Sequence, residues 1–106
     1  MPKQSRTNCP VARTLEVIGA RWTPLIMRDF LTHGARRFQD LLVSLEGIAP
    51  TTLSARLKTL ERFGVVERRT YSQHPPRAEY VLTKKGLALG RVVRAMRDWG
   101  QEYEGG

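Results

Sequence analysis

Cysteine and histidine are scarce in this chain: its 106 residues include one cysteine, Cys9, and two histidines. A single cysteine excludes a disulfide within the chain and fits a reducing compartment. Neither His33 nor His74 has a cysteine, a carboxylate or a second histidine at the spacing of metal ligands. We therefore predict no metal site and no cofactor.

Long hydrophobic runs and enzyme motifs are also missing. No apolar stretch approaches the roughly 18 residues that a membrane-spanning helix needs, and the N-terminal sequence MPKQSRTN lacks the apolar core of a signal peptide. We expect a cytoplasmic chain with no membrane partner. There is no glycine-rich phosphate loop, no nucleophile elbow and no pair of carboxylates in an apolar setting. The sequence therefore predicts that the chain is not an enzyme.

What the chain has in excess is positive charge. Its 18 lysines and arginines oppose 10 aspartates and glutamates, which gives a formal net charge of +8 and a pI near 10.6. The total alone is not decisive, because many small basic proteins bind no nucleic acid. The positions are more informative: the cationic cluster is Arg56, Lys58, Arg62, Arg68, Arg69 and Arg77, opposed there only by Glu61, Glu67 and Glu79. This clustering indicates a nucleic acid as the partner.

The segment 38–80 follows the pattern of a helix-turn-helix with a hairpin behind it. A short helix over 38–45 precedes a turn and a second helix over about 50–63, and a β-hairpin follows over about 65–83. The second helix carries one narrow apolar stripe, which predicts contact with a core along one side only. The stripe is Leu53, Leu57 and Leu60. Residues 73–76 are expected to break the hairpin ladder, because Pro75 and Pro76 lack N–H donors.

The remaining helices complete one domain over 9–103. Further helices are predicted at 9–19, 24–33 and 84–103, with flexible ends at 1–8 and 104–106. The predicted fold class is mainly α with a minor β part. It is a winged helix-turn-helix with a two-stranded wing and an additional C-terminal helix for dimerisation.

The second helix of this motif is the expected reader of DNA. An α-helix fits the major groove of B-DNA, and its N-terminal residues usually meet base edges. Cationic residues further along the helix and on the hairpin are expected to contact phosphates or the minor groove. The predicted DNA-binding residues are Thr51, Thr52, Ser54, Ala55, Arg56, Lys58, Arg68, Arg69, His74 and Arg77.

Two alternatives stay open at this point: a winged helix that acts through protein partners, and non-specific nucleic-acid binding. Base-reading RNA modules usually show stacking aromatics on a polar surface. The aromatics of this chain lie mainly in apolar stripes, which disfavours RNA.

Several short motifs together resemble one family of regulators. They are Cys9-Pro10-Val11, Gly19-Ala20-Arg21-Trp22-Thr23, Arg37-Phe38, Gly47-Ile48, Pro75-Pro76-Arg77-Ala78-Glu79-Tyr80 and Leu82-Thr83-x-x-Gly86. Over about residues 8–100 the chain is similar to the HxlR-type transcriptional regulators. The resemblance implies a bacterial or archaeal, nucleoid-associated homodimer that binds near-palindromic operators on double-stranded DNA, and it favours a repressor.

The resemblance also implies that the first and last helices form most of the dimer interface. The predicted interface residues are Leu15, Leu89, Val92, Val93, Met96, Trp99 and Tyr103. Several similar proteins sense electrophiles or oxidants through the cysteine at the place of Cys9. A helix N-terminus with cations nearby, here Arg13, Arg6 and Lys3, favours a reactive thiolate. A thiol sensor of a small electrophile or oxidant is therefore one hypothesis for Cys9, and a cysteine without a signalling role is the other.

The chain departs from the family at Ala49, where members often have a serine before the proline of the recognition helix. Ala49 cannot supply a side-chain cap, a loss of about 0.5–2 kcal/mol in comparable cases. A phosphate or another residue is expected to satisfy that helix end.

Overall fold

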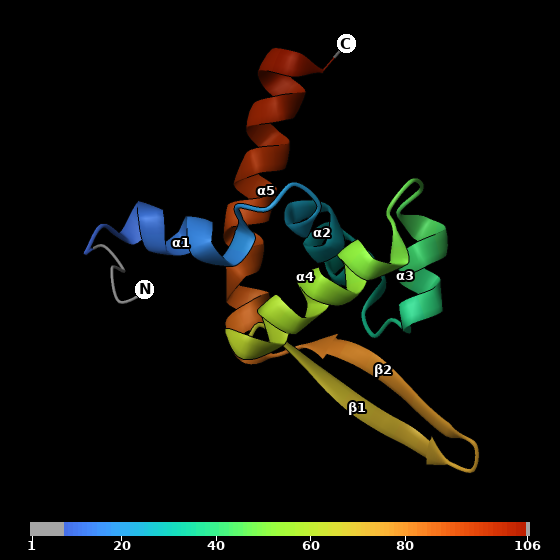
Figure 1. Ribbon diagram of the computed structural model, residues 1–106. Coiled ribbons are helices and arrows are strands. Elements are labelled where there is room, and N and C mark those ends of the chain that lie inside the picture. Colours follow the sequence, from blue (N-terminus) through green and yellow to red (C-terminus); the bar gives the residue numbers. More distant parts are fainter. Residues whose placement is uncertain (1–7, 106) are drawn as a thin grey trace.

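The computed structural model describes residues 8–105 (Figure 1). Its elements are α1 (Pro10–Ile18), α2 (Thr23–His33), α3 (Phe38–Ser44), α4 (Pro50–Arg62), β1 (Val66–Gln73), β2 (Pro76–Leu82) and α5 (Lys84–Glu104). Five helices and a two-stranded antiparallel sheet confirm the predicted fold class.

The predicted bounds of the two chain ends can be compared with the structure only in part. All but Asn8 of the predicted flexible segment 1–8 lies outside the described residues, as does Gly106. Glu104 belongs to α5, so the helix extends one residue beyond the predicted bound of 103, and the flexibility of the end stays a prediction. The helix continues one residue further because its last turn is still hydrogen-bonded, and helix ends are hard to place to better than one or two residues.

The core lies where α2 meets α4. The leucine stripe of α4 is fully buried, as its spacing predicts, and it belongs to one cluster with three fully buried side chains of α2. The α2 residues are Ile26, Met27 and Phe30. Full burial of such a side chain stabilises the fold by about 1.5–3 kcal/mol. The stripe therefore fixes α4 along one side and leaves the opposite side to solvent.

The wing is a hairpin whose ladder is longer than predicted. Its register runs from Val66 paired with Leu82 to Gln73 paired with Pro76, with a bulge between Thr70 and Ser72. The expectation that both prolines lie outside the ladder is wrong. Pro76 is the first residue of β2, a position where the missing N–H is tolerated.

The base of the wing is tied to α2 and α3 through Arg36. The Arg36 N–H donates to the Tyr80 carbonyl at 2.9 Å, and the Tyr80 N–H donates to the Arg36 carbonyl at 2.7 Å. Arg36 Nε donates to the Asp29 carboxylate at 2.8 Å, and Ser44 Oγ donates to the same buried carboxylate. A buried charge is tolerated when it is paired and hydrogen-bonded. These contacts therefore set the direction in which the wing leaves the domain.

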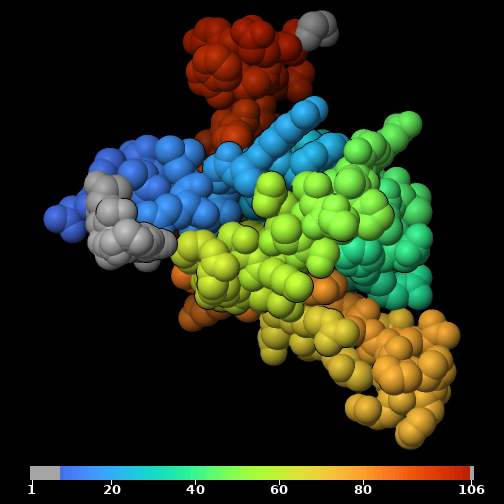
Figure 2. Space-filling view, viewed as in Figure 1, coloured from blue at the N-terminus to red at the C-terminus, as the bar shows by residue number. Residues whose placement is uncertain are grey.

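The last helix starts directly behind the wing. Thr83 caps α5, because its Oγ1 accepts from the Gly86 N–H at 3.1 Å and donates to the Gly64 carbonyl. The C-terminal half of α5 leaves the body of the domain and projects from it as a single helix (Figures 1 and 2). In the part of the chain that the structure describes, no helix is long and apolar enough to cross a membrane.

Candidate nucleic-acid interface

The solvent side of α4 carries the first group of candidate DNA contacts. Thr51, Ala55, Lys58 and Arg62 are exposed, each one turn from the next on the side opposite the leucine stripe. Ala49 is the N-cap residue in an extended conformation and makes no side-chain cap. The first N–H groups of α4 therefore have no side-chain acceptor from the N-cap. This end of the helix combines small side chains with the positive end of the helix dipole, an arrangement that favours an anion.

Three other predicted contacts of α4 are less accessible. Thr52, Ser54 and Arg56 are half-buried, because they flank the leucine stripe. Arg56 Nε is enclosed and has no hydrogen-bond partner among the described residues. The structure thus encloses the Nε of Arg56 against the domain and leaves the residue only partly exposed.

The wing carries the second group, and the register divides it between two faces. Arg68 is paired with Tyr80 and Arg69 with Glu79, so the two arginines point to opposite sides of the hairpin. Arg69 Nη2 lies 3.4 Å from a Glu79 carboxylate oxygen. Its charge is therefore partly compensated, while His74 and Arg77 are exposed at and beside the tip.

A third cationic site lies between α3 and the wing, and the sequence analysis did not predict it. A hollow of about 480 Å³ there is lined by Arg37, Asp40, Tyr71 and Arg77, among others. The Arg37 N–H donates to Asp40 Oδ2 at 2.9 Å, and its guanidinium lies 3.4 Å from the same carboxylate. These contacts lower the pKa of the Asp40 carboxyl and raise the pKa of Arg37.

The geometry explains why the sequence missed this place. Arg37 and Asp40 are close in sequence, so a capping interaction at the start of α3 was readable from their spacing of three. Tyr71 and Arg77 line the same hollow from the two strands of the wing, beside the bulge between Thr70 and Ser72. No local pattern in the sequence signals that these residues of the wing meet α3.

The predicted dimer residues divide into two groups. Leu15, Met96, Trp99 and Tyr103 are 58%, 48%, 59% and 63% exposed, so they do not serve the core of the single chain. Val93, by contrast, is 7% exposed and belongs to the core cluster, and Leu89 packs against it. This part of the α5 stripe therefore packs on its own domain, and a role of Val93 and Leu89 at the dimer interface stays a prediction. Val92 is half-buried between the two groups.

Cys9 is the N-cap residue of α1 and is exposed. Its carbonyl accepts from the Arg13 N–H at 3.0 Å, while the other expected cations, Lys3 and Arg6, lie outside the described residues. Within residues 8–105 no group of three or more histidine, cysteine, aspartate or glutamate side chains could hold a metal ion.

Comparison with known proteins gives a consistent family. The family model of HxlR-like helix-turn-helix proteins matches residues 17–105. The HTH-type transcriptional regulator YdeP of Bacillus subtilis is 38% identical over 96 residues, which span 91% of this chain and 74% of YdeP.

Two solved structures agree with this. The redox regulator HypR in its oxidised form matches with a TM-score of 0.82 at 36% identity, covering 89% of this chain and 96% of that one. The reduced form of the transcriptional regulator YodB from B. subtilis matches with a TM-score of 0.77 at 32% identity, covering 92% and 95%. Together with the winged helix-turn-helix fold, these matches show that the chain belongs to the HxlR-like helix-turn-helix family of transcriptional regulators.

Proposed function

We propose that the chain is a repressor that binds a near-palindromic operator as a homodimer, with α4 in the major groove and the wing on the adjacent backbone. One observation carries the proposal. The solvent side of α4 carries small side chains at its N-terminal end and cations further along, and the leucine stripe on the opposite side leaves it uncovered. No large apolar side chain on it calls for a protein partner.

The residues have different tasks in this arrangement. Thr51 and Ala55, at the N-terminal end of α4, let the helix approach base edges closely. Lys58 and Arg62 lie further along, where phosphates are the nearer partners. Arg77, with Arg37 across the hollow between α3 and the wing, supplies a further phosphate contact. Arg37 suits that task because the Asp40 carboxylate holds its guanidinium in place.

The dimer is proposed to form through α1 and the projecting half of α5. Met96, Trp99 and Tyr103 are exposed there, and the Trp99 and Tyr103 rings lie 5.3 Å apart. A symmetric dimer brings two copies of α4 to one face of the DNA, so the two half-sites are expected about 10–10.5 base pairs apart or a multiple of that.

The test is a gel shift of the purified protein on the intergenic DNA upstream of its own gene, with excess competitor DNA. We expect a discrete complex that survives the competitor and that weakens steeply as salt is raised. Loss of the complex to competitor would leave non-specific nucleic-acid binding. A protein that binds no DNA at low salt would support the alternative of a protein partner.

We further propose that modification of the Cys9 thiol switches DNA binding. The thiol is exposed at the N-terminus of α1, an element of the proposed interface. A thiol oxidant such as diamide takes two electrons, and the one cysteine of each chain then forms a disulfide with a second subunit or with a small thiol. We expect diamide to release the wild-type protein from DNA and to leave a Cys9→Ser variant bound. An equal response of both proteins would exclude Cys9 as the sensor.

A further inference from the structure

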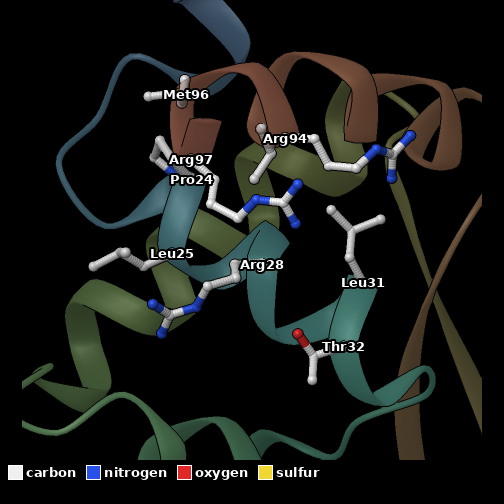
Figure 3. A pocket seen from close by; sticks show the side chains of 9 residues that line it. Pro24, Leu25, Arg28, Leu31, Thr32, Arg94, Met96 and Arg97 are labelled. Atoms are coloured by element: carbon white, nitrogen blue, oxygen red, sulfur yellow. The ribbon is translucent and has the colours of Figure 1, made fainter. Parts of the chain in front are cut away.

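A hollow of about 440 Å³ lies between α2 and α5, on the opposite side of α2 from the helix that faces DNA (Figure 3). Its volume falls in the range of about 300–1,000 Å³ that is typical of small-molecule sites. Leu31 and Val93 form an apolar floor, and Leu25 and Met96 extend the apolar lining to the rim. None of the proposed DNA contacts lines it.

Three arginines line the same hollow, and no carboxylate does. Arg28 comes from α2, whereas Arg94 and Arg97 come from α5 (Figure 3). Within the described chain, neither Arg28 nor Arg94 has an ion-pair partner, and Arg97 is paired only with its neighbour Asp98 at 2.9 Å. Both side chains of that pair are exposed, so the pair is weak and yields readily to another anion.

Gly90 makes room for one of these arginines. A Cβ at this position would lie 3.0 Å from Leu31 Cδ2 and 3.1 Å from Arg94 Nη1. The guanidinium of Arg94 therefore lies directly over the helix backbone, beside the apolar floor. A guanidinium in that position presents its planar donors to an incoming carboxylate next to a surface that accepts an apolar body.

We propose that this hollow binds a small organic anion, namely a carboxylate on an apolar body. The carboxylate is held by Arg94, whose guanidinium lies beside Leu31, and the body lies against Leu31 and Val93. The regulatory consequence rests on the proposed function. A ligand here joins α2, whose buried side carries α4, to α5, the proposed dimer helix, and so biases the spacing of the two DNA-reading helices.

The test is isothermal titration calorimetry of the full-length protein with 2-naphthoate, using 2-naphthamide as a neutral control of similar shape. We expect saturable binding at one site per chain. The amide and the Arg94→Gln variant should each weaken it by about tenfold or more, the effect of losing charge-assisted hydrogen bonds. Arg91→Gln is the matched control, because Arg91 lies on α5 outside this hollow and should leave binding unchanged.

Several results would overturn the proposal. One is the absence of saturable 2-naphthoate binding up to about 10 mM, a range that covers millimolar affinities. The others are equal binding of the acid and the amide, and an equal loss of binding in the Arg91→Gln control. Sedimentation of the same variants tests the other possible occupant of the hollow, a second copy of the chain. If the Arg94→Gln variant dissociates into monomers and 2-naphthoate does not bind the wild type, the carboxylates of a second copy of the chain fill the hollow instead. A gel shift on the same samples separates the two claims, since DNA binding without naphthoate binding contradicts only the ligand site.

Discussion

At the scale of single residues, exposure decides which side chains of α4 are accessible to the proposed DNA partner. Thr51, Ala55 and Lys58 are exposed, while Arg56 is half-buried with its Nε enclosed. Arg56 stands directly before Leu57, so it flanks the buried stripe, where a long cationic stem commonly covers apolar surface. The sequence contained this signal, because every residue next to a buried stripe is a candidate for such packing.

Removal of phosphate contacts should weaken DNA binding without changing its sequence preference. We expect Lys58→Ala and Arg77→Ala each to lower affinity for all duplexes about equally and to reduce the slope of the salt dependence by about 1. Thr51→Val should instead change the preference between operator variants, by about 1–3 kcal/mol if Thr51 contacts a base. Fluorescence anisotropy over a series of mutated operators measures both. Uniform losses in all three variants would show that this end of α4 does not read bases.

The Asp40 carboxylate should stabilise the fold only while it is ionised. Its pKa is lowered by the Arg37 N–H and guanidinium. Its contribution is therefore complete above its unfolded pKa of about 3.9 and is lost as the pH falls through the lower, folded value. We expect Asp40→Asn to reduce the free energy of unfolding by about 0.3–1 kcal/mol at pH 7. That difference should shrink below about pH 4.

Urea unfolding at both pH values measures this effect. Asp98→Asn, in an exposed pair, serves as the control and should stay within about 0.5 kcal/mol of wild type. An Asp40→Asn deficit that is the same at low pH would contradict the assigned role.

At the scale of elements, local patterns predicted the helices well and the wing less well. The leucine spacing of α4 specifies which side is buried, because that information lies within one helix. The pairing of Arg36 with Tyr80 joins segments far apart in sequence, and the bulge near Tyr71 depends on how the hairpin meets α3. Neither has a local signature in the sequence. The pairing of Arg36 with the wing and the hollow lined by Arg37 therefore could not be predicted.

The junction of the wing and α5 should tolerate no side chain at Gly86. A Cβ there would lie 2.1 Å from the Val65 carbonyl oxygen, which is backbone and cannot move aside. We expect Gly86→Ala to destabilise the protein by about 2–4 kcal/mol, in the upper range for single substitutions. Gly100→Ala in the same helix is the control, since a Cβ there meets nothing within 4 Å. It should be neutral or stabilising by up to about 1 kcal/mol. Thermal unfolding of both variants measures the contrast, and similar midpoints would contradict it.

At the scale of the whole molecule, α5 has two tasks along its length. Its first half packs on the domain through Leu89 and Val93, and its second half projects with Met96, Trp99 and Tyr103 exposed. The sequence showed one continuous stripe and could not divide it, because the point where a helix leaves its own domain depends on the position of the other helices.

A charge on the projecting half should separate the subunits without unfolding them. We expect Trp99→Glu to weaken the dimer by about 2 kcal/mol or more, as for a central aromatic of an interface. Leu87→Glu is the control: Leu87 is 58% exposed on α5 and lies nine residues from Met96, about half a turn around the helix. Sedimentation equilibrium, with circular dichroism as a check of folding, measures both. A Trp99→Glu protein that remains dimeric would place the interface elsewhere.

The most direct measurement of the central claim is a DNase I footprint of the full-length protein on its upstream DNA in the presence of competitor. We predict two protected half-sites of related, inverted sequence, spaced by about 10–10.5 base pairs or a multiple of that. Protection should disappear when either half-site is scrambled. Uniform protection of any DNA, or a single protected half-site that is indifferent to scrambling of its neighbour, would contradict a dimeric operator-binding regulator.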